Sequence, residues 1–182
     1  MGLNKPELQE LGAPIMAATV DTFFSITRDL LPTPLKCHYT FNLRDPAKML
    51  QGVLMVSLKT DLTDKDSLVS LSLHEACRQF RDRLIHEEDR AWFNETVRAN
   101  LKKHLGVSVE TEKFDGLVYG DFFDFGAVQK EYVASPGEEK LLDTFNAYLD
   151  DYNNTYPSKM NLVFFKDARD HLARVARIIR QP

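Results

Sequence analysis

Residues 30–55 read LLPTPLKCHYTFNLRDPAKMLQGVLM, and this stretch is the strongest guide to the fold. Pro32 and Pro34 end the preceding helix, because proline disfavours helical geometry in the residue before it. A short connector, LKCHYTFN at residues 35–42, follows. Asp45 followed by Pro46 then marks a new helix start, since proline is well tolerated in a first helical turn. The stretch therefore predicts a helix, a connector and a second helix.

Helical spacing of apolar residues extends this pattern in both directions. The first helix opens at Pro14, and the helix that starts at Asp45-Pro46 is the second. A polar turn is expected at residues 61–67, before the third helix. The fourth helix begins near Glu87 and stops at Gly106, since glycine commonly follows a helix end. A helical bundle is therefore predicted. The expected apolar faces of its four helices are Ile15, Ala18, Thr19, Thr22, Phe23 and Ile26; Met49, Leu50, Val53 and Leu54; Leu73, Ala76, Cys77, Phe80 and Leu84; and Trp92, Phe93, Val97 and Leu101.

Glycine placement predicts where the bundle ends. Five of the eight glycines lie between residues 106 and 137, and clustered glycines separate regular elements. We therefore expect one unit over residues 1–108 and another over 109–182. The second unit should open with a loop or short strand at 116–125 and continue with two helices, the first starting at 135–140 and the last from about Leu162. The last helix is expected to bury Phe165, Ala168, Leu172, Val175 and Ile179. The predicted fold class is mostly α.

Composition narrows the functional classes. Apolar residues make up 43% of the chain and charged residues 27%, which is ordinary for a globular protein. A net charge of -4 argues against a nucleic-acid partner. No apolar run has the length of a membrane span, so no membrane partner is expected. Two cysteines, Cys37 and Cys77, fit a reducing compartment, with cytosol or cytoskeleton as the default.

Short motifs for metal binding are incomplete. HEACR at residues 74–78 begins like the zinc-protease helix motif, but Arg78 stands where the second histidine is needed. A calcium loop is excluded because its required glycine is missing from Asp61, Asp64, Asp66 and their neighbours. A zinc site with two cysteines and two histidines would consist of Cys37, His38, His74 and Cys77. It is disfavoured because Cys37 and His38 are adjacent and would point in different directions. We expect no metal site.

No catalytic motif is complete either. The phosphate-binding loop is absent, since no glycine is followed by Lys-Ser or Lys-Thr, and no catalytic residue is expected. Taken alone, Arg44 is a surface arginine that pairs with Asp45 or a neighbour. The last helix carries a local excess of positive charge, for which a solvated face beside an apolar stripe is the simplest interpretation.

Residues 30–55 also closely resemble the start of the lid subdomain in the third AAA+ module of dynein heavy chains. The shared pattern is Pro-Thr-Pro at 32–34, His-Tyr at 38–39, Phe-Asn-Leu-Arg-Asp at 41–45 and Gln-Gly at 51–52. Pro46 departs from the family pattern, but proline fits this first turn. The likeness continues in order along nearly the whole chain. Residues 73–93 resemble the next lid helix pair, 117–123 the lead-in to the fourth module, and 160–182 the helix before its phosphate loop.

The resemblance implies a function and three site residues. Arg44 resembles the sensor-II arginine, which reaches nucleotide phosphates from the lid and whose guanidinium bonds phosphate oxygens in a fork. Leu162 and Val163 resemble the lining of the adenine pocket in the fourth module. The chain would be a non-catalytic part of an ATP-driven microtubule minus-end motor in the cytoskeleton, with the ending ARIIRQP favouring the axoneme of a cilium or flagellum.

The same resemblance implies the partners. ATP or ADP with Mg would belong to the intact parent and not to this chain alone. The direct partner would be the rest of the heavy-chain ring, and the parent would bind microtubules and intermediate and light chains. The linker, nucleotide loops, stalk and microtubule-binding tip of the family are missing from this sequence, and the chain is expected to stop a few residues short of a phosphate loop. The alternative is an independent helical adaptor that binds a partner through exposed apolar faces.

Overall fold

The structure is a computed structural model that describes residues 10–56, 64–128 and 130–180. The described part is mostly helical, which confirms the predicted fold class, and the chain divides into two compact units after Leu117. The boundary expected after residue 108 lies earlier than this division. Val109 and Phe114 are buried in the core of the first unit, so the segment that follows Gly106 stays with the bundle.

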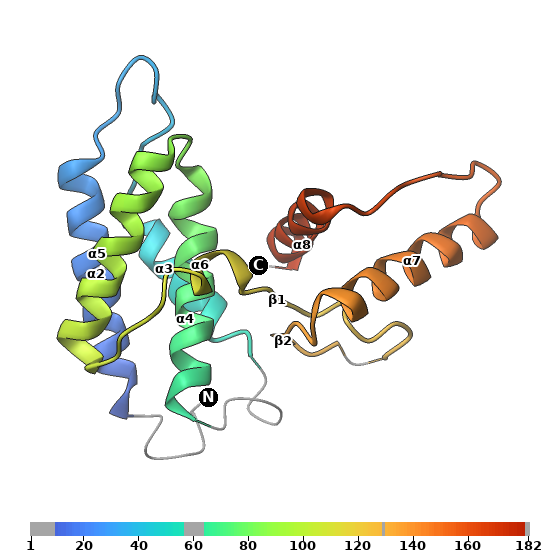
Figure 1. Ribbon diagram of the computed structural model, residues 1–182, viewed down its shortest axis with the longest axis horizontal. Helices are drawn as coiled ribbons and strands as arrows, with labels where there is room; N and C mark the ends of the chain where they lie inside the picture. The colour runs from blue at the N-terminus through green and yellow to red at the C-terminus, as the bar shows by residue number, and fades with distance from the viewer. Residues whose placement is uncertain (1–9, 57–63, 129, 181–182) are drawn as a thin grey trace. The chain divides into compact units, whose positions relative to one another are not determined.

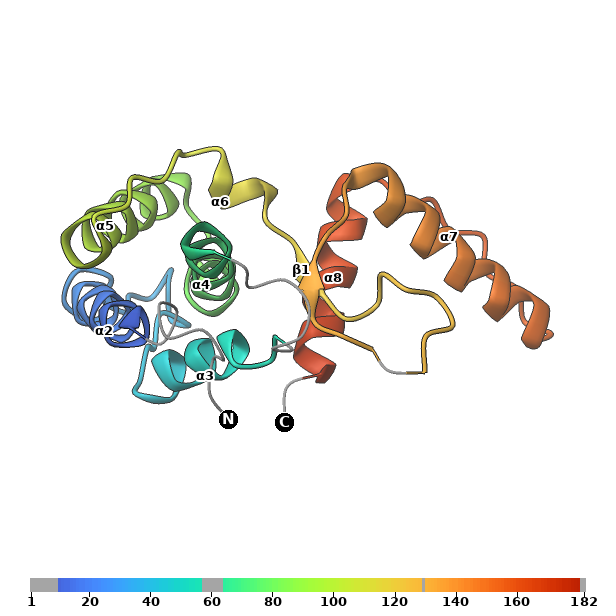
Figure 2. The ribbon, with the colours of Figure 1, turned by 90° about the horizontal axis from the view of Figure 1, so that it is seen from below.

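The first unit is a bundle of helices. Figure 1 shows its two longest helices side by side, and Figure 2 shows the bundle from below. The shorter α3 packs on α4, while α2 packs mainly on α5. Its elements are α2 (Gly12–Asp29), α3 (Arg44–Val53), α4 (Lys65–Gln79), the 3-10 turn η1 (Arg81–Arg83), α5 (Glu87–Leu105) and the short α6 (Lys113–Gly116).

Local sequence signals explain two of these helix ends. The Asp64 carboxylate accepts the backbone N–H of Ser67 at 2.7 Å, so α4 begins with an N-cap. The polar turn predicted at 61–67 is therefore wrong for Lys65–Ser67, which form the first helical turn; residues 61–63 lie outside the described part. The predicted stop at Gly106 is confirmed, because its φ of 66° is in the left-handed region that glycine favours.

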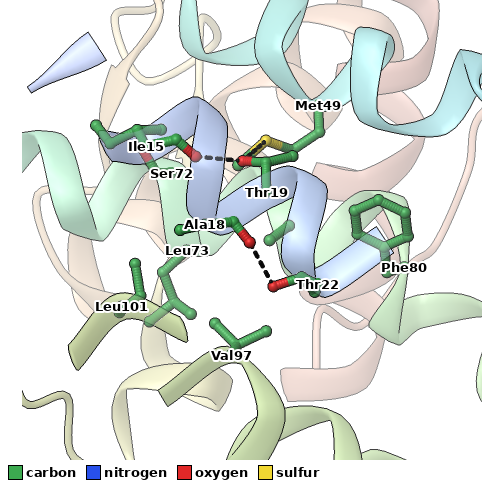
Figure 3. A pocket seen from close by; sticks show the side chains of 11 residues that line it. Ile15, Ala18, Thr19, Thr22, Met49, Ser72, Leu73, Phe80, Val97 and Leu101 are labelled. Carbon is green, nitrogen blue, oxygen red and sulfur yellow. Dashed lines mark hydrogen bonds between the residues drawn. The ribbon is translucent and has the colours of Figure 1, made fainter. Parts of the chain in front are cut away.

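The predicted apolar faces form the core of the first unit, with Leu54 as an exception at 75% exposed. A cavity of about 20 Å³, enough for roughly one water, lies among residues of α2 to α5, and Figure 3 shows its lining. The hydroxyls of Thr19 and Thr22 each donate to the carbonyl four residues earlier at 2.8 Å. Both polar groups are thereby satisfied within α2 and tolerate burial.

The contact between α3 and α4 depends on a glycine. A β-carbon at the buried Gly52 of α3 would overlap the carboxylate of Glu75 on α4. Glu75 is fully buried, so its side chain has little room to move aside. The absence of a side chain at residue 52 therefore allows the two helices to approach each other.

The second unit, from Val118, has a short hairpin and two helices. Strand β1 (Tyr119–Gly120) pairs antiparallel with β2 (Val133–Ala134), with Tyr119 opposite Ala134. The short strand expected within 116–125 is thus present. Helices α7 (Glu138–Thr155) and α8 (Lys166–Arg180) follow. The small core of this unit is formed by Phe122, Leu141, Phe145 and Ala173.

The last helix differs from its prediction in two respects. It begins at Lys166 and not near Leu162, because the preceding segment is held as a non-helical return along α7. There Asn153 exchanges two hydrogen bonds with the backbone of Met160, at 2.8 and 2.9 Å, and the Phe164 ring lies 5.5 Å from the Phe145 ring.

The predicted buried stripe of α8 is also wrong. Leu172 and Val175 are each 37% exposed and Ile179 is 79% exposed, whereas Ala173 and Arg177 are the buried residues of this helix. The apolar residues instead line a groove of about 660 Å³ between α7 and α8. The stripe is apolar, as predicted, but nothing in the described residues covers it.

Replacing Gly52 by alanine should lower the free energy of unfolding by about 2 kcal/mol, because the new methyl group overlaps Glu75. Helix propensity alone predicts the opposite sign, since alanine is favoured over glycine inside a helix. Urea unfolding followed by the fluorescence of Trp92, the single tryptophan, measures the change. The matched control is Gly12→Ala, where no atom lies within 4 Å of the added carbon. Equal stability of Gly52→Ala and wild type would contradict the prediction.

Backbone amides of the second unit should exchange with solvent faster than those of α2, α4 and α5. The second unit buries few apolar side chains and leaves one face of α8 exposed, so local opening costs less free energy there. Hydrogen exchange of the whole chain followed by mass spectrometry tests this difference. Uniformly strong protection across residues 118–180 would refute it.

Candidate functional site

Arg44 is the first residue of α3, and its side chain is exposed. It borders a shallow hollow together with Phe23, Asn42 and Leu43. The arginine thus lies at the positive end of a helix dipole. An exposed guanidinium in this position suits contact with an anion from outside the bundle.

The start of α3 is fixed by reciprocal side-chain hydrogen bonds. The Asn42 amide oxygen accepts the backbone N–H of Arg44 at 2.9 Å. In return, Asp45 Oδ2 accepts the backbone N–H of Asn42 at 2.7 Å. The arrangement resembles a capping box, in which two residues satisfy each other's backbone groups at a helix start. The backbone N–H of Arg44 is therefore satisfied by Asn42, and the second bond closes the turn from Asn42 to Asp45 around it.

The other oxygen of Asp45 accepts hydrogen bonds from the last residue of α4 and from the turn η1 that follows it. Asp45 Oδ1 accepts Gln79 Nε2 at 2.8 Å and Arg83 Nη1 at 3.0 Å. The ion-pair partner of Asp45 is thus Arg83. Of the partners that the sequence suggested for Arg44, Asp45 or a neighbour, Asp45 is therefore wrong. Sequence reasoning missed this pair because the two residues are 38 positions apart. The one signal that pointed to Arg83 was its position within residues 73–93, which resemble a lid helix pair of dynein heavy chains.

The connector before Asn42 is anchored separately to the start of α5. Asp89 Oδ2 accepts Lys36 Nζ at 2.6 Å and the Tyr39 hydroxyl at 2.8 Å. The Tyr39 oxygen in turn accepts the backbone N–H of Ile85 at 3.0 Å. Burial alone would raise the pKa of Asp89, but the hydrogen bonds from Lys36 and Tyr39 outweigh burial and lower it.

These residues fit one contact with a nucleotide and not a complete binding site. Arg44 offers charged donors in a geometry that matches phosphate oxygens. One common way to hold a nucleotide is a loop of backbone amides around the phosphates, and the motif of that loop does not occur in the sequence. Arg44 can therefore contribute to a nucleotide site that is built mainly by other residues.

The two other predicted site residues belong to the second unit. Leu162 is 49% exposed and lines the apolar groove between α7 and α8. Val163 is 80% exposed and does not line this groove. Arg44 lies in the first unit, so the three predicted site residues are divided between the two units.

The remaining candidates from the sequence are not gathered into a site. Within the described ranges, no group of three or more His, Cys, Asp or Glu side chains is arranged to hold a metal ion. His74 Nδ1 lies 2.9 Å from the carbonyl oxygen of Leu117. Burial raises the pKa of the Cys77 thiol to about 12, so this cysteine is not a thiolate nucleophile at neutral pH. Among the described helices, none has the length and apolar character of a membrane span.

Acid should destabilise the first unit through Asp89. Because the folded-state pKa of Asp89 is lowered, its stabilising contribution is present above the unfolded pKa of about 3.9 and is lost as pH falls through the folded value. Urea midpoints measured at several pH values should fall less between about pH 5 and pH 2.5 for Asp89→Asn than for wild type. Glu110→Gln, at an exposed carboxylate, is the control and should retain the wild-type slope. Parallel curves for Asp89→Asn and wild type would count against the prediction.

Comparison with known proteins agrees with the fold and with the resemblance. A family model described as the AAA+ lid domain matches residues 15–113, which include Arg44. The chain is 41% identical over 176 residues to dynein axonemal heavy chain 1 of Mus musculus and 39% identical over 180 residues to dynein axonemal heavy chain 6 of Homo sapiens. It is 32% identical over 192 residues to dynein axonemal heavy chain 12 of Homo sapiens.

Each of these alignments covers 97% of this chain. The chain spans only 4% of the length of heavy chains 1 and 6 and 6% of heavy chain 12. The residue pattern at 30–55 therefore identified the relatives correctly. The chain belongs to the AAA+ lid domain family and is similar over nearly its whole length to axonemal dynein heavy chains.

Proposed function

We propose that this chain is a component of the AAA+ ring of a dynein motor and that its first unit is the lid over a nucleotide bound to the neighbouring large subdomain. The observation that carries the proposal is the exposed Arg44 at the start of α3. Its backbone is held by Asn42, and it lies within the residues that match the AAA+ lid domain. The resemblance of residues 30–55 supports the third module of the ring as the proposed position of this lid.

The proposed role of Arg44 is to bond phosphate oxygens from the lid side. A guanidinium keeps its charge at all physiological pH values and donates in a planar fork, which suits a phosphate. In the intact heavy chain, ATP or ADP with Mg would occupy the site, and ATP hydrolysis would supply the free energy for motion. This chain would perform no chemistry alone, because no phosphate-binding loop is among its residues.

The bundle is suited to pass movement between modules. α3 packs on α4, and Asp45 bonds to Gln79 and Arg83 at the end of α4. A displacement of the phosphate at Arg44 would therefore move α3 and α4 together. A rigid lid of this kind relays a change at one nucleotide site to the adjoining module.

The second unit would begin the following module of the ring. Leu162 and Val163 are exposed apolar residues in the segment before α8, which supports a role in lining an adenine pocket when the rest of that module is present. The rest of the heavy-chain ring is the proposed partner, and it would cover the apolar groove. The location would be the axoneme, as the names of the relatives indicate.

The groove also gives the alternative function its one supporting observation. An apolar surface with Phe122, Tyr148 and Leu172 on its walls is open to solvent in the second unit, and such a surface is typical of a protein-binding site. An independent adaptor would use this groove and would have no need of Arg44. Dependence on Arg44 therefore distinguishes the two functions.

In a chimaera in which this chain replaces the aligned residues of mouse axonemal heavy chain 1, Arg44→Ala should lower steady-state ATP turnover at least about threefold, because a charged donor to phosphate is lost. The matched control is Arg98→Ala, which removes another arginine of the lid, paired with Glu95 on α5, and should leave turnover unchanged. Calorimetry on the 182-residue chain alone should detect no micromolar ATP binding. Wild-type turnover by the Arg44→Ala chimaera would favour the adaptor.

A further inference from the structure

Asp45 is a buried carboxylate beside an exposed arginine. It is 6% exposed, and its oxygens accept hydrogen bonds from three segments of the first unit. These segments are the connector at Asn42, the end of α4 at Gln79 and the turn η1 at Arg83. A buried carboxylate with this many donors is held in one position.

Arg83 extends the same network back to the connector. Its Nη1 donates to Asp45, while its Nη2 donates to the carbonyl oxygen of Thr40 at 2.8 Å. Its guanidinium carbon also lies 4.5 Å from the centroid of the Phe41 ring, a cation–π distance. One planar guanidinium therefore touches the connector and the helix start at the same time, which a lysine ammonium cannot reproduce.

The network affects how Arg44 can act. An unpaired carboxylate close to an arginine weakens the attraction of that arginine for an anionic ligand, because the negative charge offsets part of the positive one. Here both Asp45 oxygens are engaged by other donors, and the carboxylate charge is offset by Arg83. Asp45 is thereby directed into the bundle, while the side chain of Arg44 remains at the surface.

We infer that Asp45 and Arg83 are positioning residues for the contact between Arg44 and a phosphate. They fix the first turn of α3 against the corner of α4 and η1, so that Arg44 meets its ligand in one orientation and moves with α4. This inference rests on the proposed function of Arg44. It adds that the strength of the phosphate contact depends on a buried pair that itself touches no ligand.

The inference predicts the sign of an effect on anion binding. Inorganic tripolyphosphate is the probe, because it carries the oxygens of a nucleotide without the base. Binding to the full chain is followed by NMR through the backbone amide signals of Leu43 and of residue 45, which is Asp in the wild type and Asn in the Asp45→Asn variant. If Asp45 acted only through its charge, Asp45→Asn would strengthen tripolyphosphate binding, since a negative charge near Arg44 is removed. A positioning role predicts weaker binding, by about three- to tenfold.

Arg83→Lys is the second variant, because it preserves the net charge and removes the fork. It should also weaken binding, by about threefold, since only one of the two contacts of Arg83 can be retained. The matched control is Glu95→Gln, which removes an exposed carboxylate of α5 that pairs with Arg98 at 2.9 Å. Both residues of this pair lie on α5 and outside α3, the end of α4 and η1, so Glu95→Gln should leave binding at Arg44 unchanged.

The outcomes separate this inference from the function on which it rests. Unchanged binding in Arg44→Ala would reject the phosphate contact itself. Loss of binding in Arg44→Ala, with wild-type or tighter binding in Asp45→Asn, would overturn only the positioning role. If Asp45→Asn does not fold, Arg83→Lys decides: weaker binding supports the inference, and wild-type binding rejects it.

Discussion

The buried carboxylate of Asp45 is the interaction on which the candidate site depends. A buried charge is tolerated only when it is paired and hydrogen-bonded, and removing one partner is far more costly than forming the pair is favourable. Asp45 meets this condition by drawing Asn42, Gln79 and Arg83 together from three segments. The geometry of the helix start that carries Arg44 is therefore a consequence of satisfying a neighbouring charge. The close approach of α3 to α4 at Gly52 completes the same arrangement.

The first unit was largely predictable because its signals are local. Apolar spacing found the helices, and Gly106 marked the end of α5. The family pattern at 30–55 identified the lid. What could not be predicted is which residues meet across the bundle: Asp45 and Arg83 are separated by 38 positions, and spacing along one helix carries no information about such a pair. The assignment of Arg44 to a phosphate contact remains a prediction from resemblance.

The second unit was predicted less well, and the reason is physical. Periodicity finds an apolar stripe but does not say whether anything covers it. In α8 the stripe of Leu172, Val175 and Ile179 faces an open groove, and the opposite side of the helix, at Ala173 and Arg177, is buried. The helix start was placed too early because MNLVFF at 160–165 is apolar, yet it packs as a non-helical return. An apolar run alone does not distinguish these two conformations.

The phenol of Tyr39 gives the connector a second sensitivity, at the opposite end of the pH scale from Asp89. Burial, reinforced by the hydrogen bond to the Asp89 carboxylate, raises the pKa of Tyr39. The folded state therefore retains this proton more strongly than the unfolded chain, and the stabilisation is lost as pH rises through the folded pKa. Acid removes the acceptor and alkali removes the donor of one hydrogen bond. The Tyr39–Asp89 bond in the segment that leads into Arg44 is thus intact only in the interval between two ionisations, with neutral pH inside it.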